Sequence, residues 1–340
     1  MLYVTTRSKQ DVYTAQRALL ENRASDGGFY VPFRHPAFDA SEIDALGERT
    51  FNQNVAILLN RLLGTKLSGW DVDFAIGRYP VRVTDLHHRI HIAESWHNPQ
   101  WVYSRVEQCL ADQFGISGTP SDWFRIGIRI AVLFGIYGEL IRSKAISHGM
   151  KMDVSVVSGD FSAPMSAWYA RTWGLPVGNI ICCCNENSEI WNLICHGQFR
   201  TDVIGISTAY PMADITLPAD LERLIYECGG EGETSRYLEL CRSGRMYCPD
   251  DETLAKLRDG LFISVVSSKR IRETIPNVYG THSYMMSSYT ALAYAGLLDY
   301  RVKKQESGHA VVLSEISPVG DSENVSAALG ISVKDISTLI

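Results

Sequence analysis

The chain has 340 residues, of which 46% are hydrophobic, and a formal net charge of −6. This length is enough for a sizeable core in one large or two ordinary domains. The negative charge and the lack of any long basic run argue against nucleic acid or an anionic membrane as partner. No apolar run reaches the roughly 18 residues of a membrane span, and residues 1–11 lack the apolar core of a signal peptide, so we expect a cytoplasmic protein.

The first part of the chain is expected to be scaffold. Gly27 and Gly28 supply a tight turn within residues 24–32. Residues 41–63 predict helices, because Ser41 can cap a first turn that is acidic and an apolar stripe follows at helical spacing.

Two groups of potential metal ligands are better explained without a metal. The eight cysteines form no C-x-x-C pair and no paired Cys/His spacing of the zinc type. The run from Cys182 to Cys184 follows two isoleucines and predicts a buried strand, where free cysteine packs as a small hydrophobe. Residues 84–93 predict a strand that carries His87, His88 and His91 at its surface or edge. We therefore expect no metal site.

Strands and helices alternate over the rest of the chain. Residues 122–142 are apolar enough for a buried helix, and residues 152–157 alternate like a strand. After a loop at residues 158–163, a helix closes at Gly174 and a strand follows at residues 180–187. A charged helical insert is expected at residues 229–248, and two further strands are expected at residues 261–267 and 309–314. This alternation predicts an α/β layer with a parallel sheet.

Residues 94–105 read E-S-W-H-N-P-Q-W-V-Y-S-R and resemble the lysine motif of threonine synthase, E-L-F-H-G-P-T-x-A-F-K-D. Glu94, His97 and Pro99 match this motif. Other segments resemble the family's D-G-G-L-Y-V-P, Y-Y-A-K-x-M-G-L-P-I-G, A-T-N-x-N-D and M-D-I-S-x-P-S-N-x-E-R motifs, at residues 24–32, 168–176, 180–187 and 214–224. Threonine synthase is a pyridoxal-phosphate (PLP) enzyme of fold type II, the tryptophan synthase beta-like fold.

The resemblance implies an α/β fold in which helices flank a parallel sheet. It divides the chain into an N-terminal threonine-synthase-like subdomain, residues 1–92, and a truncated large α/β domain, residues 93–340. Only 16 residues separate Ser104 from Ser121, where the family has a whole small domain. That domain carries the T-S-G-D-T-G loop that cradles the PLP phosphate. We therefore expect the small cofactor domain to be largely deleted.

The family's Schiff-base lysine corresponds to Ser104, and Arg105 replaces the aspartate that follows it. A hydroxyl cannot form an imine, so the family's usual reaction is blocked at its first covalent step. No lysine lies in the other retained cleft motifs.

Two further positions depart from the family pattern. Residues 158–163 resemble the loop S-G-N-F-G-D, whose asparagine bonds the phenolic oxygen of PLP, and Asp160 takes its place. A carboxylate there would repel the phenolate. Glu315 lies where the family residue contacts the pyridine nitrogen, which is not the usual arrangement for this fold type. We therefore expect no cofactor and the loss of PLP binding.

These departures favour a catalytically silent, threonine-synthase-like protein with a binding, regulatory or assembly role. The alternative is an enzyme that reuses the old cleft for PLP-independent chemistry. His97 beside Ser104, together with Asp160, would echo a nucleophilic triad, but no G-x-S-x-G elbow surrounds Ser104. An active PLP-dependent threonine synthase or lyase is the least favoured hypothesis.

Any surviving ligand site is expected beyond the carboxyl ends of the strands, where open parallel sheets bind ligands. The candidates are His97, Ser104, Ser158, Asp160, Ser162 and Asn187. These small, hydroxylic and acidic side chains suit a small polar or cationic ligand better than a phosphate. They could also simply cap strand ends and bond one another. We further expect a homo-oligomer or a protein partner at the face near Trp96, Trp101, Asp160 and Ser287.

Overall fold

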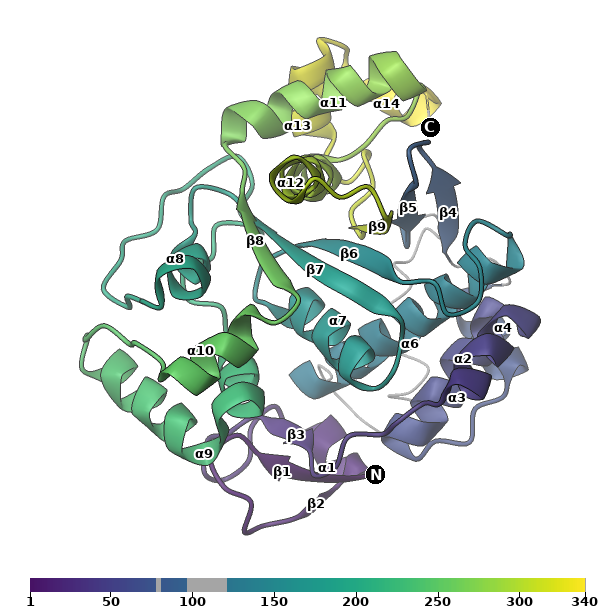
Figure 1. Cartoon of the computed structure of the whole chain (residues 1–340). Helices are drawn as coiled ribbons and strands as arrows, with labels where there is room; N and C mark the ends of the chain where they lie inside the picture. Colours follow the sequence, from purple (N-terminus) through teal and green to yellow (C-terminus); the bar gives the residue numbers. More distant parts are fainter. Residues whose placement is uncertain (78–80, 97–120, 340) are drawn as a thin grey trace.

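The computed structural model describes residues 1–77, 81–96 and 121–339, which contain two sheets of unequal size (Figure 1). The smaller sheet has the strand order β2-β1-β3 and is antiparallel throughout. Its strands are β1 (Leu2–Thr5), β2 (Tyr13–Thr14) and β3 (Tyr30–Pro32).

Helices lie between and after these strands, and they pack mainly against one another and against the long helix α6 (Asp122–Arg142) (Figure 1). They are α1 (Ala15–Leu20), α2 (Ala40–Asp44), the 3-10 helix η1 (Ala45–Glu48), α3 (Phe51–Leu63) and α4 (Gly69–Ile76). Helix α3 begins where Thr50 and Gln53 cap each other reciprocally, and it ends at Gly64, which has a φ of 68°. Its apolar stripe is buried, so the helices predicted over residues 41–63 are confirmed, but the first of them, α2, is capped by Asp39 and not by Ser41.

The larger sheet has the order β4-β5-β9-β6-β7-β8. Its strands are β4 (Arg82–Asp85), β5 (Ile90–Glu94), β6 (Met152–Val157), β7 (Val177–Cys184), β8 (Leu261–Val265) and β9 (His309–Ser314). All neighbours are parallel except β4 and β5, which pair antiparallel. The predicted α/β fold is confirmed, and the sheet is mixed rather than wholly parallel, because a short turn joins β4 to β5.

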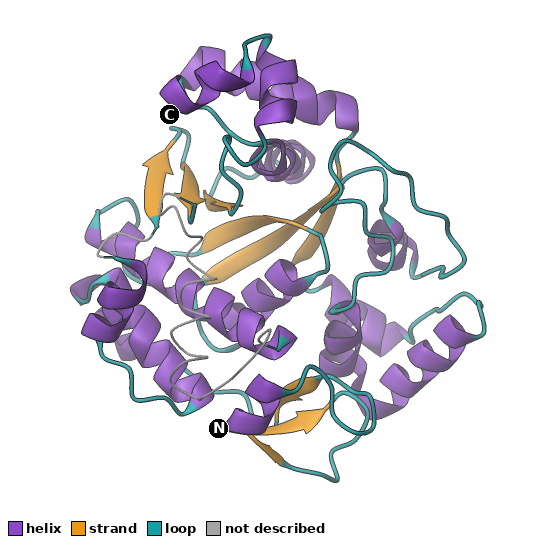
Figure 2. Ribbon diagram, turned by 180° about the vertical axis from the view of Figure 1, so that it is seen from behind, coloured by secondary structure: helices purple, strands orange, loops and turns teal. Residues whose placement is uncertain are grey.

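Helices cover both faces of this sheet (Figure 2). Helices α6 (Asp122–Arg142) and α7 (Ser162–Thr172) pack on one face, and α12 (Ser288–Lys304) packs on the other. The remaining helices are α8 (Glu189–His196), α9 (Leu221–Arg242), α10 (Asp251–Arg258), α11 (Ser268–His282), α13 (Ser322–Leu329) and α14 (Val333–Leu339). In β7, Cys182 and Cys184 face one core cluster and Cys183 faces the other, so the predicted core role of these cysteines is confirmed.

Three details differ from the sequence predictions. The single strand expected over residues 84–93 is wrong, because His87, His88 and Arg89 all have positive φ and turn the chain between β4 and β5. His91 is not a surface residue: it is buried in β5 and stacks on His309, with ring centroids 5.5 Å apart. The predicted boundary at residue 92 falls inside β5, which pairs with β9 along its whole length.

The helical insert predicted over residues 229–248 is the second half of α9. Gly230, with a φ of 74° and a ψ of −168°, is non-helical and divides α9 into two helical segments, so the predicted insert contains the second segment. Among the described residues, no helix is long and apolar enough to cross a membrane.

Candidate functional site

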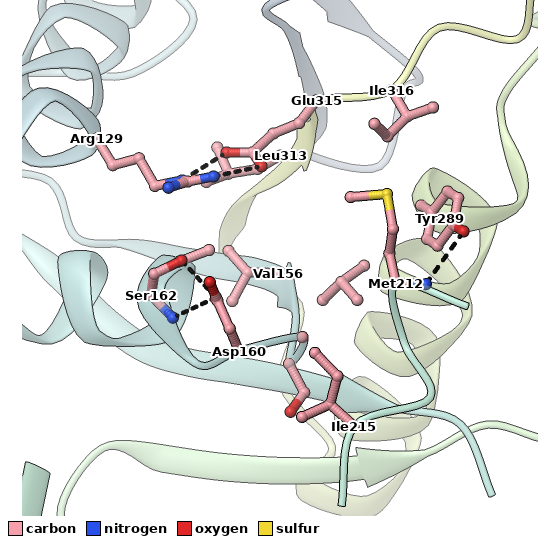
Figure 3. Close-up of a pocket in the computed structure, with 14 residues that line it drawn as sticks. Arg129, Val156, Asp160, Ser162, Met212, Ile215, Tyr289, Leu313, Glu315 and Ile316 are labelled. Carbon is pink, nitrogen blue, oxygen red and sulfur yellow. Dashed lines mark hydrogen bonds and ion pairs between the residues drawn. The ribbon is translucent and has the colours of Figure 1, made fainter. Parts of the chain in front are cut away.

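A cavity of about 240 Å³ lies at the carboxyl ends of β6 and β9 (Figure 3). Its walls come from helices, strand ends and loops that are far apart in the sequence. The lining residues are Arg129, Val156, Val157, Ser158, Gly159, Asp160, Ser162, Ala163, Met212, Ile215, Tyr289, Leu313, Glu315 and Ile316. The ends of parallel strands are the expected place for a ligand in a sheet of this kind.

Asp160 lies in the sharp turn between β6 and α7. Gly159 and Phe161 on either side of it have φ values of 47° and 74°, and the Phe161 ring is buried, which holds this turn in place. The Oδ1 atom of Asp160 accepts hydrogen bonds from the Ser162 amide at 2.9 Å and from the Ser162 hydroxyl at 2.5 Å. The carboxylate thereby occupies the positive end of α7. Both bonds use Oδ1, so Oδ2 has no hydrogen-bond partner among the described residues.

Arg129 and Glu315 form a two-pronged ion pair on the opposite side of the cavity (Figure 3). The guanidinium donates from Nε to Oε1 at 3.1 Å and from Nη2 to Oε2 at 3.3 Å. The two side chains are only 12% and 20% exposed. The pair ties α6 to the segment after β9, and its fork geometry fixes both side chains against the cavity.

Apolar side chains separate these two polar groups. Val156 and Leu313 come from adjacent strands, and Met212 and Ile215 come from the long loop between α8 and α9. Burial raises the pKa of Tyr289, so its phenol stays neutral and its oxygen accepts a bond from the Met212 amide at 3.5 Å. The described lining therefore combines apolar walls with two carboxylates and one guanidinium, and it is net negative.

The structure brings together three of the residues predicted from the sequence, since Ser158, Asp160 and Ser162 all line the cavity. His97 and Ser104 lie outside the described residues. Asn187 does not line the cavity. Its amide instead binds the loop that carries Met212 and Ile215, accepting from the Ile206 amide at 2.7 Å and donating to the Ile206 carbonyl at 2.8 Å.

Sequence reasoning missed several residues of the lining. Arg129 could have been identified from the sequence as a candidate, because it is a charged residue in the middle of a buried, apolar helix. Met212, Ile215 and Tyr289 have no such signal, since nothing in their local sequence shows that they face a cavity. Glu315 was noted, but not as the partner of Arg129.

The face expected to bind a partner is only partly accessible. Ser287 is fully buried, and its hydroxyl caps α12 by accepting a hydrogen bond from the Thr290 amide. Trp96 is half-buried and donates from its indole nitrogen to the Ser314 hydroxyl at 2.9 Å. Asp160 is exposed, and Trp101 lies outside the described residues.

Comparison with known proteins gives a consistent result. Residues 2–73 match the family described as "Threonine synthase N terminus". Threonine synthase of Pseudomonas aeruginosa is 25% identical over 234 residues, which is 66% of this chain and 48% of that protein. Human threonine synthase-like 1 is 24% identical over 181 residues, 52% of this chain and 24% of that protein. The chain thus spans about a quarter to a half of the length of these relatives.

Solved structures of threonine synthases share the fold. The enzyme from Brucella melitensis superposes with a TM-score of 0.83 at 18% identity, covering 97% of this chain and 92% of that chain. The yeast enzyme gives a TM-score of 0.81 at 16% identity, with coverage of 100% and 94%. The α/β fold is therefore that of the PLP-dependent fold type II proteins.

The expectation of no cofactor is wrong. It treated a few changed contacts as loss of the cofactor, whereas the Brucella melitensis threonine synthase, which has the same fold, was solved with PLP bound. The described cavity fits the ring of such a group, because Val156, Leu313 and Ile316 offer apolar walls beside polar groups. Arg129 is the only cation in the described lining, and it already pairs with Glu315.

Proposed function

We propose a function for this chain as a member of the threonine synthase family: it binds a small ligand in the cavity at the carboxyl ends of β6 and β9 and does not itself form threonine. The observation that carries the proposal is the set of ionisable groups in the described lining. It contains two carboxylates and a guanidinium, and no amine among the described residues. By its resemblance to the family's lysine motif, the sequence has Ser104 where the family has its lysine.

The ligand that suits this lining is small and carries an ammonium group. The free Oδ2 of Asp160 can accept from an ammonium without disturbing the bonds of Oδ1 to Ser162. The hydroxyl of Ser162 and the apolar side chains of Val156 and Leu313 surround the rest of the space. Such a mixture of apolar walls and a few directed polar groups is typical of small-molecule sites.

PLP would lie in the same cavity. Bound there, it would supply an electron sink for chemistry at an amino acid. In this chain, the apolar side chains of Val156, Leu313 and Ile316 would hold its ring, and by the resemblance Asp160 takes the place of the family's asparagine. Without a lysine at position 104 the cofactor has no family anchor, which favours a binding role over turnover.

A PLP titration of the purified protein tests the proposal. Absorbance should report binding, whereas borohydride reduction followed by peptide mapping should recover no lysine adduct, and no threonine should form. A reduced adduct at one lysine, or measurable turnover, would show that the chain is an enzyme of the usual kind.

A thermal-shift screen of amino acids, amines and phosphorylated metabolites identifies the ligand class. We expect amines to raise the melting temperature, and Asp160→Asn to abolish that response. Asp39→Asn is the matched control, because Asp39 also caps a helix but lies away from the cavity. Stabilisation by phosphorylated compounds alone, unchanged in Asp160→Asn, would contradict the proposed ligand class.

A further inference from the structure

One side of β8 has no neighbouring strand in the part of the chain that the structure describes. At the two ends of β8, the backbone groups of Gly260 and Val266 bond to β7. Backbone groups along a strand alternate in direction, so the N–H and C=O groups of Leu261, Ile263 and Val265 point away from the sheet. These residues present a row of donors and acceptors that no described residue satisfies.

The open side of β8 is the floor of a groove of about 420 Å³. Helices α8 and α12 lie on either side of β8 and form its walls (Figure 1). The lining residues are Ser188, Trp191, Phe262, Ile263, Ser264, Val265, Asp299 and Lys303. A groove with a strand edge as its floor has the form that accepts one more extended strand.

This edge also lacks the features that usually prevent strands from pairing between molecules. Charged side chains, prolines and bulges protect most sheet edges. The opposite edge strand, β4, carries Arg82 and Asp85, whereas β8 reads L-F-I-S-V and carries no charge. Val265 is 40% exposed and Val302, on the adjacent helix, is 79% exposed. We therefore expect another strand to pair with this edge.

We propose that a second copy of this chain covers it, with the two β8 strands pairing antiparallel around a two-fold axis. The strand itself is an extended, uncharged segment in which four of the five residues are apolar, which is what the groove would recognise. The pairing joins two six-stranded sheets into one continuous sheet.

Charge complementarity selects a second copy as the occupant. A two-fold axis that pairs the strands antiparallel also sets the two α12 helices in opposite directions on the same face of the joined sheet. Asp299 and Lys303 both line the groove and are one helical turn apart, so Lys303 of each copy faces Asp299 of the other. The Oδ1 atom of Asp299 already lies 2.6 Å from Nη1 of Arg270 in its own chain, so the Lys303 ammonium of the other copy would meet Oδ2. Lys303 lies over the Phe262 ring, 5.3 Å from its centre, and forms no ion pair among the described residues, which leaves it available.

Sedimentation and amide hydrogen exchange of the full chain test this interface. We expect a dimer whose formation slows exchange at Leu261, Ile263 and Val265 as the protein concentration rises. Val265→Lys places a protecting charge on the edge and should give a monomer with an unchanged circular dichroism spectrum. A monomer at all concentrations would overturn the proposal, and so would a dimer that Val265→Lys leaves intact.

A charge-swap experiment locates the interface independently. Lys303→Asp sets like charges opposite each other, and it should raise the dimer dissociation constant by at least about tenfold. Asp299→Lys should do the same, and an equimolar mixture of the two variants should recover association, because each supplies the charge that the other lacks. Lys304→Asp, next along the helix and outside the groove, is the control and should have no effect. Failure of the mixture to recover association would refute this arrangement.

Discussion

The ion pair between Arg129 and Glu315 can be tested by a double-mutant cycle. The variants are Arg129→Gln, Glu315→Gln and the double variant, and the measurement is the free energy of unfolding in urea. Each single variant also removes other contacts of the substituted side chain. The cycle cancels these contributions and leaves the coupling energy between Arg129 and Glu315.

The structure sets the size of the expected coupling. Exposed ion pairs contribute roughly 0.2–1 kcal/mol, and hydrogen bonds to charged groups in protein interiors contribute about 1.5–3 kcal/mol. Arg129 and Glu315 make two bonds, at 3.1 and 3.3 Å, with side chains 12% and 20% exposed. This geometry lies between the two cases, so we expect a coupling energy of about 1–2 kcal/mol.

Salt provides a second readout of the same pair. Because both side chains are mostly buried, the coupling should fall only modestly between low salt and about 1 M salt, where the screening length is about 3 Å. A coupling energy below about 0.5 kcal/mol, or one that disappears in salt, would show that the pair behaves as a surface contact.

Three further predictions concern stability and the loop beside the cavity. Burial lowers the pKa of both His91 and His309, so the folded protein binds these protons less tightly than the unfolded chain does. The free energy of unfolding should therefore fall as the pH drops below about 6.5, and His309→Gln should reduce that fall. Gly174→Ala should destabilise the protein by at least about 1–3 kcal/mol in urea unfolding, because its φ is 110° and a Cβ would lie 2.5 Å from a backbone oxygen. Gly280→Ala, in open space within a helix, should instead stabilise it by about 0.4–1 kcal/mol, and the reverse order would refute the reasoning. Asn187→Ala should speed proteolysis within residues 197–220, because it removes the bonds to Ile206, and an unchanged cleavage rate would contradict this role.

The sequence predicted the parts of the fold that local patterns determine. The strand predicted at residues 180–187 from an apolar run is present but begins and ends three residues earlier, as β7 (Val177–Cys184), and the loop predicted around Asp160 is also present. The partner of Arg129 could not be found in this way, because Glu315 is 186 residues further along the chain. The separate antiparallel strand β4 was also missed. The turn between β4 and β5 consists of three non-glycine residues with positive φ, and their residue types do not predict a turn.

The carboxylate at the start of α7 also affects how the cavity discriminates between charges. The Asp160 carboxylate accepts a hydrogen bond from the amide of Ser162, only two residues further along the chain. Its effective concentration at this amide is therefore higher than that of any dissolved anion. An anionic compound that enters must compete with this resident group for the end of the helix. A cationic compound faces no such competition, and its contact with the carboxylate adds to the existing bonds. The first turn of α7 therefore works as a filter for ligand charge, set by a single side chain.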